Sequence, residues 1–228
     1  MYRLSPSTIN LMLECPRCFW LHIVKKIKRP QMVFPSITNG MDRVLKEHFD
    51  RFMERGEIPP EIREHCNNHG YELFKDKELL KIWRNVSKGL QYKDGNSGVL
   101  VKGAIDNLLV KNGKLVVIDY KTRGFPVKED SHEYYQAQMD IYAFLLKHNG
   151  YDVENYAYLL FYHPEKVLET GEFVFNMEMK RIGVSPEKGK MLIDKAIKIL
   201  NGPMPEPSEG CKFCEWVEKV KDSERCYI

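Results

Sequence analysis

The feature that most constrains the fold is the pair Asn112-Gly113, set between two runs rich in Val, Ile and Leu. Asn-Gly between apolar runs is the strongest short signal for a two-residue β-hairpin turn. Counting outward from this turn places Asp106 opposite Asp119. Opposite side chains project to one face of a sheet, and Lys121 shares that face because it lies two residues beyond Asp119. Two acids and a lysine are therefore expected to converge.

Two carboxylates at this spacing indicate a cation site, because they repel each other unless a cation lies between them. Mg²⁺ or Mn²⁺ suits oxygen ligands of this kind. An isolated Asp-x-Lys triplet is more often a surface ion pair. Three motifs in a fixed order favour a site instead: GAID ends at Asp106, IDYKT begins at Ile118, and QMDIY begins at Gln138.

This order of motifs resembles the RecB-like branch of the PD-(D/E)XK nuclease superfamily, in which GxxD, (D/E)xK and QxxxY follow one another. The opening SPSTINLMLECPRCFWL resembles the start of the same branch. It is most similar to the iron-sulfur nucleases of CRISPR adaptation and to AddB-type nuclease domains. The resemblance covers the centre and both ends of the chain, and only residues 31–91 match weakly.

The resemblance implies a role for each matching residue. Asp106 and Asp119 would bind the metal together with the backbone carbonyl of Tyr120. Lys121 would orient or help to deprotonate the attacking water. Gln138 and Tyr142, one helical turn apart, would position Lys121 or a phosphate oxygen, although Tyr142 also fits an apolar stripe that would pack in the core. The list of expected catalytic residues is Asp106, Asp119, Lys121, Gln138 and Tyr142.

One departure from the family pattern concerns a further metal ligand. The family often has a histidine four residues after a glycine in the preceding helix, but Val44 stands at that distance from Gly40. His48, one turn further on, or Asp42 would have to replace it, so His48 is a candidate metal ligand. A lone helical histidine is more often a packing or surface residue. The number of catalytic metal ions therefore stays open.

Two CxxC pairs, Cys15/Cys18 and Cys211/Cys214, suit four thiolates around one metal centre. In the iron-sulfur nucleases that the chain resembles, one N-terminal cysteine joins three C-terminal ones around a 4Fe-4S cluster. Cys15, Cys211 and Cys214 are common to two assignments. Either Cys226 completes an iron-sulfur cluster, or Cys18 completes a zinc site or a cluster. Reduced cysteines without metal are the third reading.

Nucleic-acid contacts cannot be inferred from bulk charge, because 35 Lys and Arg nearly balance 32 Asp and Glu to give a net charge of +3. Arg17, Lys25 and Lys26 gather local positive charge beside Phe19 and Trp20, which predicts contact with a phosphate backbone. The alternative is a solvated basic helix end packed by its aromatics. No motif is typical of base reading, so contact independent of sequence is expected.

The periodicities predict an α/β fold: a restriction-endonuclease-like core with a mixed central sheet flanked by helices, plus a helical N-terminal region and a Cys-containing C-terminal tail. We expect a single domain over 1–228, with a mainly helical part (1–92), catalytic sheet and helices (93–202), and a Cys-rich tail packing on the N-terminus (203–228). Strands are expected in the hairpin 99–121 and at 155–162 and 172–179, and helices at 41–56, 76–90, 131–147 and 185–202.

No segment approaches the roughly 18 apolar residues of a membrane span and no signal peptide is visible, so a cytoplasmic protein is expected. The predicted function is a metal-dependent deoxyribonuclease, acting as an exonuclease on single-stranded or frayed DNA ends in DNA repair, recombination or CRISPR-type defence. The end preference follows from the resemblance. The alternative is an inactive DNA-binding or assembly module of the same fold. The acid pair argues against that alternative, since carboxylates without metal weaken phosphate binding.

Overall fold

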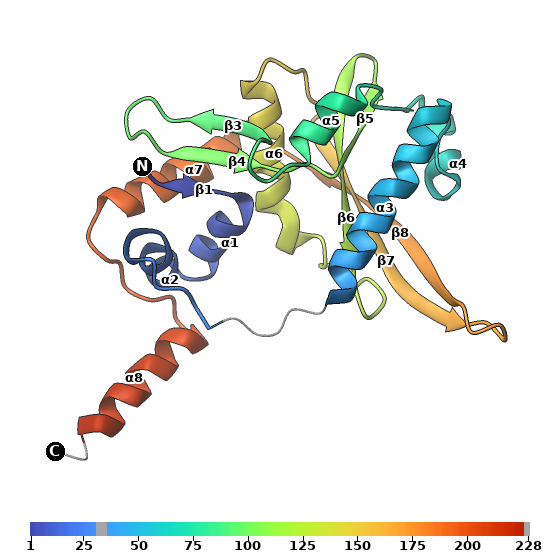
Figure 1. Cartoon of the computed structure of the whole chain (residues 1–228). Coiled ribbons are helices and arrows are strands. Elements are labelled where there is room, and N and C mark those ends of the chain that lie inside the picture. Colours follow the sequence, from blue (N-terminus) through green and yellow to red (C-terminus); the bar gives the residue numbers. More distant parts are fainter. Residues whose placement is uncertain (31–35, 226–228) are drawn as a thin grey trace.

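The centre of the fold is a five-stranded mixed sheet in the order β2-β5-β6-β7-β8. The computed structural model describes residues 1–30 and 36–225, with side chains up to 221 (Figure 1). β6 and β7 are parallel, and the other neighbours are antiparallel. The strands are β2 (Glu72–Leu73), β5 (Asn107–Lys111), β6 (Lys114–Thr122), β7 (Tyr156–Val167) and β8 (Phe173–Gly183).

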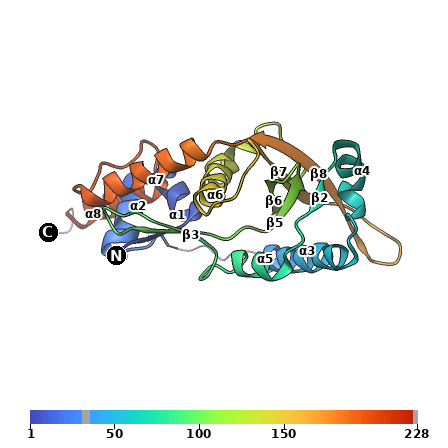
Figure 2. The ribbon, with the colours of Figure 1, turned by 90° about the horizontal axis from the view of Figure 1, so that it is seen from above.

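β6 is covered on both faces, because its apolar residues alternate between two cores. Val117 packs into the core that includes α6, and Ile118 packs into the core that includes α3. Figure 2 shows α6 and α3 on opposite sides of the sheet. The predicted α/β fold with a mixed sheet flanked by helices is confirmed. The first face carries α1 (Pro6–Glu14), α6 (Gln136–His148) and α7 (Pro186–Asn201), and the second α3 (Ser36–Arg55) and α4 (Pro60–His69).

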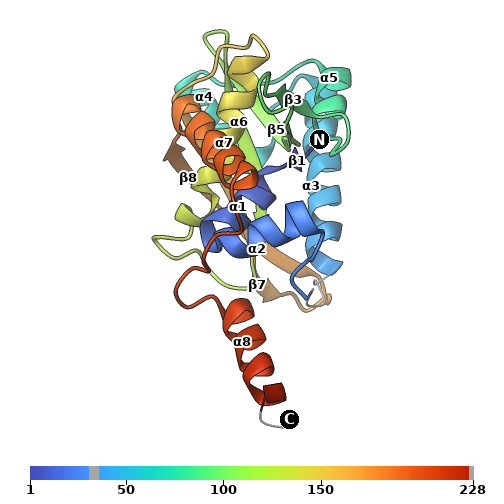
Figure 3. The ribbon, with the colours of Figure 1, turned by 90° about the vertical axis from the view of Figure 1, so that its left-hand side faces the viewer.

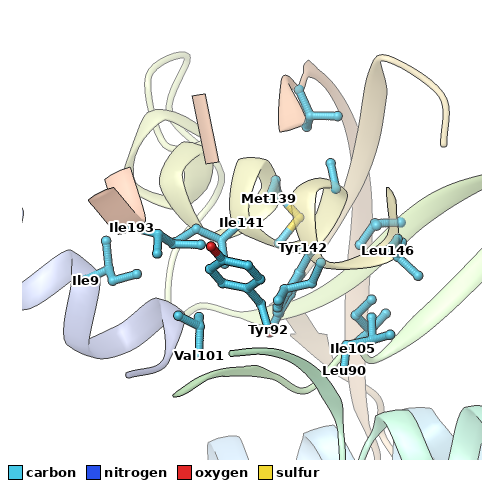
Figure 4. Packing of buried hydrophobic residues seen from close by; sticks show 14 of the residues in the cluster. Ile9, Leu90, Tyr92, Val101, Ile105, Met139, Ile141, Tyr142, Leu146 and Ile193 are labelled. Atoms are coloured by element: carbon cyan, nitrogen blue, oxygen red, sulfur yellow. The ribbon is translucent and has the colours of Figure 1, made fainter. Parts of the chain in front are cut away.

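A second, three-stranded sheet of order β1-β4-β3 packs against α6. Figure 4 shows Tyr92 and Val101 of this sheet in one apolar cluster with Met139 and Ile141 of α6. The glycine of the GAID motif has a packing role here, since a Cβ at Gly103 would lie 2.6 Å from a methyl carbon of Leu145. The strands are β1 (Arg3–Leu4), β3 (Leu90–Lys93) and β4 (Leu100–Gly103).

The hairpin prediction was right about the turn and its register but wrong about the length of its first strand. Asn107 pairs with Ile118, as counting from the turn requires, but β5 begins only at Asn107. The residues before it cross to the second sheet, and the carbonyl of Asp106 accepts a hydrogen bond from Arg84 Nε (2.7 Å). Asp106 therefore lies beside Asp119 without being its partner in the ladder.

Other helix boundaries also differ from the predictions. The helix expected at 76–90 ends at Trp83, because the side chain of Asn85 accepts hydrogen bonds from two backbone amides of the turn that follows. α3 begins at Ser36 and runs through Gly40. This shortened helix is α5 (Lys77–Trp83). The sequence pattern did not predict α4 or α8 (Lys212–Arg225).

The segment before α8 contacts the N-terminal helices. Trp20 Nε1 donates to the carbonyl of Gly202 (3.2 Å), and Arg17 Nε donates to the carbonyl of Pro205 (3.1 Å). These residues belong to α2 (Pro16–Trp20) and to the stretch after α7. α8 itself projects away from the body (Figures 1 and 3). Within the described ranges, the helices are all too short or too polar to cross a membrane.

Candidate active site and cysteine cluster

Gln138 connects the acid and the lysine of β6. Asp119 is 1% exposed and faces α6, where Gln138 Nε2 donates to its Oδ1 (3.0 Å). Gln138 Oε1 accepts from Lys121 Nζ (3.2 Å), and Lys121 also forms an ion pair with Asp119. The Tyr142 hydroxyl accepts from Gln138 Nε2 (3.0 Å) and donates to the carbonyl of Ala104 (2.5 Å). One network thus joins the second and third motifs to the GAID segment.

Asp106 enters the site from the link between the two sheets. Its Oδ2 accepts from the backbone N–H of Tyr120 (3.1 Å), and its Oδ1 lies 2.9 Å from Lys46 Nζ. Lys46 also contacts Asp42 Oδ2 (2.8 Å). The sequence pattern pointed to Asp42 as a possible substitute ligand, but it carried no signal for Lys46. This lysine neutralises Asp106 from α3.

The site fits a hard divalent cation. Asp119 Oδ2 is buried and makes no aligned hydrogen bond with any described residue, although Lys121 is its ion-pair partner. The Tyr120 side chain points to the opposite core, where its hydroxyl accepts from Asn107 (2.9 Å), so only its backbone faces the acids. Two carboxylates and a backbone carbonyl form a set of oxygen donors that suits Mg²⁺ or Mn²⁺.

Stability without divalent cation should depend on Asp119. Burial raises the pKa of Asp119 to about 7, which is the net value after Lys121 lowers it and the charge of Asp106 raises it. An unfolded aspartate titrates near ~3.9. Between about pH 4 and 7 the folded protein therefore holds a proton that the unfolded chain releases, so the free energy of unfolding falls as the pH rises.

Urea unfolding at pH 5 and pH 8, without added divalent cation, should show this fall, on the order of 1–3 kcal/mol. Asp119→Asn should remove most of it. Asp152→Asn, which changes an exposed aspartate, should leave it intact. An equal pH dependence in Asp119→Asn and wild type would contradict the assignment.

His48 lies on the other flank of α3. Its Nε2 is 3.1 Å from Glu61 Oε1, and its ring packs edge-on against Phe52. Lys46, two positions earlier and so on a different side of the helix, is the α3 residue that contacts Asp106. The structure therefore does not bring His48 to the acid pair.

A cavity of about 530 Å³ opens beside Gln138 and Tyr142 and extends along α1 to Arg29. Sequence patterns did not identify this cavity. Arg29 lies at its far end and pairs with Glu14 (2.5 Å). Lys102 of β4 also lines it.

The predicted DNA contacts have different surroundings. Besides its bond to Pro205, Arg17 pairs with Glu206 (2.8 Å) and Glu218 (3.5 Å), so its guanidinium holds the C-terminal segment. Lys25 lies over the Trp20 ring, 5.7 Å from its centroid. Lys26 is exposed and ends the helical turn in a left-handed conformation (φ 62°).

Cys15, Cys18, Cys211 and Cys214 form a buried cluster whose sulfur atoms all lie within 4.8 Å of one another. This is the set in which Cys18 is the fourth member, and Cys226 lies outside the described residues. Although burial raises it, hydrogen bonds from backbone N–H groups lower the pKa of Cys15 to about 7. Four buried sulfurs at this spacing suit zinc or an iron-sulfur cluster.

A mixed α/β fold that presents two carboxylates and a lysine beside a cavity is typical of nucleases that use divalent cations. The chain belongs to the PD-(D/E)XK nuclease superfamily, whose model matches residues 3–218. The match includes all three motifs and both cysteine pairs, so the predicted superfamily is confirmed. Among curated proteins, none matches the sequence.

Proposed function

We propose that the protein is a divalent-metal-dependent exonuclease that hydrolyses phosphodiester bonds of single-stranded or frayed DNA ends. The observation that carries this proposal is the joined network of Asp119, Lys121 and Gln138, with Asp106 beside it, next to the cavity. The preference for ends is supported by the resemblance to RecB-like nucleases. The same resemblance suggests a role in DNA repair, recombination or CRISPR-type defence.

Asp106, Asp119 and the Tyr120 carbonyl would hold the metal ion. When bound, the ion supplies a Lewis acid for the phosphate and lowers the pKa of a coordinated water. Although burial lowers it, the charge of Asp119 raises the pKa of Lys121, so the ammonium group stays protonated. Lys121 would therefore act as a cation and hydrogen-bond donor toward the phosphate or the attacking water.

Gln138 sets the direction in which Lys121 points. The Tyr142 hydroxyl donates to Ala104, so its oxygen is an acceptor, and the amide nitrogen of Gln138 must face it. The amide oxygen is then directed at Lys121. Tyr142 is 5% exposed, so it both packs in the core and fixes the amide. Both proposed roles of this residue are compatible.

Gln138→Ala should reduce kcat tenfold to a hundredfold, because a hydrogen bond to a charged group contributes about 1.5–3 kcal/mol. The matched control is Gln136→Ala, two residues earlier on the same helix, where the amide bonds to Asp140 and to the carbonyl of Gly183. Steady-state cleavage rates measure both variants. Equal losses in both would show a general effect on α6 rather than a role at Lys121.

Substrate topology tests the proposed end preference. End-labelled linear single-stranded DNA should be degraded with Mg²⁺ or Mn²⁺ and left intact with chelator. Covalently closed single-stranded circles should persist under the same conditions, and a duplex with frayed ends should be cut more slowly than the linear single strand. Cleavage of circles at the linear rate would show an endonuclease and contradict the proposal.

A further inference from the structure

A second polar cavity lies on the sheet face opposite Asp119. Its volume is about 370 Å³. Tyr158, which lines it, packs in the same core as Ile118 and Tyr120, whereas Asp119 and its neighbour Lys121 face α6. The cavity is therefore separate from the candidate active site. Its lining includes His65 and His69 of α4, Lys111 of β5, Tyr156 and Tyr158 of β7 and Arg181 of β8, together with Tyr71 and Glu154 from the segments just before β2 and β7.

Two cations of this cavity have no carboxylate partner among the residues described. Lys111 Nζ lies over the Tyr71 ring, 4.9 Å from its centroid, and the Arg181 guanidinium lies over the Tyr156 ring at 4.0 Å. Stacking fixes where the two cations lie, while their N–H groups remain free to donate. Glu154 is the one acid in the lining. The cavity is therefore positively charged, and the two tyrosine rings hold its cations in place.

Three buried tyrosine hydroxyls and a histidine form a chain beside these cations. His65 Nε2 is 2.9 Å from the Tyr158 hydroxyl, which is 3.0 Å from that of Tyr71, which in turn is 2.8 Å from that of Tyr156. Each hydroxyl has one proton to donate. When His65 carries a proton on Nε2 it donates to Tyr158, Tyr158 donates to Tyr71, and Tyr71 donates to Tyr156.

The hydroxyl proton of Tyr156 then has no acceptor among these four side chains and is available to a ligand. If the hydrogen bonds run in the opposite direction, Tyr156 donates to Tyr71, Tyr71 donates to Tyr158, and His65 Nε2 is the final acceptor. An anion in the cavity selects the first direction, because it accepts the free O–H of Tyr156 next to two cations. The cavity therefore offers a hydroxyl donor, a guanidinium and an ammonium group.

We propose that this cavity binds the phosphate group of a nucleotide, either free or within a DNA strand. A tetrahedral anion uses donors that converge from several directions, and Arg181 can donate two parallel hydrogen bonds to it. The volume also leaves room for more than an isolated anion. That the phosphate belongs to a nucleotide rests on the proposed nuclease function. The anion site itself does not.

Calorimetric titration of the full-length protein with sulfate tests the anion site without requiring cleavage. Lys111→Gln and Arg181→Gln should each weaken sulfate binding about tenfold because each removes a positive charge, and Tyr156→Phe should weaken it about fivefold because it removes a hydroxyl donor. Lys114→Gln changes the lysine that pairs with Lys111 across the hairpin but does not line the cavity, so it should bind like wild type. Affinities that are equal in all four variants and wild type would overturn the proposal.

Two further titrations identify the source of the phosphate. Binding of a 5′-mononucleotide that is weakened by Arg181→Gln identifies a free nucleotide as ligand. Binding of an oligonucleotide without a terminal phosphate, weakened by the same substitution, identifies a strand. Both results support the site. If sulfate binds in an Arg181-dependent way while no DNA is cleaved, the anion site stands and the proposed nuclease function fails. If DNA is cleaved but sulfate and nucleotides bind independently of Arg181, the anion site is overturned.

Discussion

Asp119→Asn should abolish cleavage, lowering kcat/KM by at least about a thousandfold, or roughly 4 kcal/mol of transition-state stabilisation. The substitution keeps the shape of the side chain and an oxygen that can accept from Gln138. It removes the negative charge that would hold a divalent ion and that pairs with Lys121. Cleavage of end-labelled DNA in Mg²⁺ or Mn²⁺ measures the loss.

The fold should survive this change, which makes the result interpretable. The variant loses a buried carboxylate whose pKa is raised by burial, so circular dichroism and thermal unfolding should show an intact protein. The matched control, Asp152→Asn, changes an exposed aspartate and should cleave at the wild-type rate. Retention of full activity in Asp119→Asn would exclude this carboxylate from the chemistry. If the wild type also fails to cleave but binds DNA, the inactive binding module takes the place of the nuclease.

We propose that the cysteine cluster holds zinc or an iron-sulfur cluster, so Cys211→Ser should release it and lower the melting temperature by about 10 °C or more. Structural metal binding contributes several kcal/mol to folding, and each kcal/mol corresponds to about 2–4 °C in a chain of this size. The loss should be large here because the buried cluster joins α2 to the segment that begins α8. Metal content per chain and calorimetric melting measure the two effects, and visible absorbance distinguishes iron-sulfur from zinc.

Two other cysteines provide the controls. Cys66 is fully buried in the other core, and burial raises its thiol pKa to about 11, so Cys66→Ala should keep the full metal content. Cys18→Ser should lose the metal as Cys211→Ser does, whereas Cys226→Ser should keep it. Loss of metal in Cys226→Ser but not in Cys18→Ser would support the other assignment of the fourth ligand.

Local sequence rules predicted the centre of the site because that centre is built from neighbouring residues. The Asn112-Gly113 turn fixes the register of β5 and β6, and both residues have the positive φ that such a turn requires. The helical spacing of Gln138 and Tyr142 then gives one face of α6. Each of these relations extends over a few residues of chain, so periodicity and turn chemistry determine it.

Relations between distant segments were not accessible in the same way. Lys46 reaches Asp106 only because α3 packs across the second face of the sheet. Strand periodicity could not show that β4 and β5 belong to different sheets, because both runs are equally apolar. Arg17 was predicted to contact DNA because it stands near aromatic residues, and pattern reasoning gave no signal for its ion pair with Glu206, which lies 189 positions away.

The cysteine cluster also determines when during synthesis the enzyme can become complete. Cys15 and Cys214 are 199 positions apart, so the first pair leaves the ribosome long before the second exists. α1 ends beside this cluster, and its Leu11 both packs on the sulfurs and lines the cavity next to Gln138. One wall of the cavity therefore gains its final support only after Cys211 and Cys214 have emerged. A nascent chain that ends before Cys211 therefore lacks one contact that holds α1, and with it this wall of the cavity, in place.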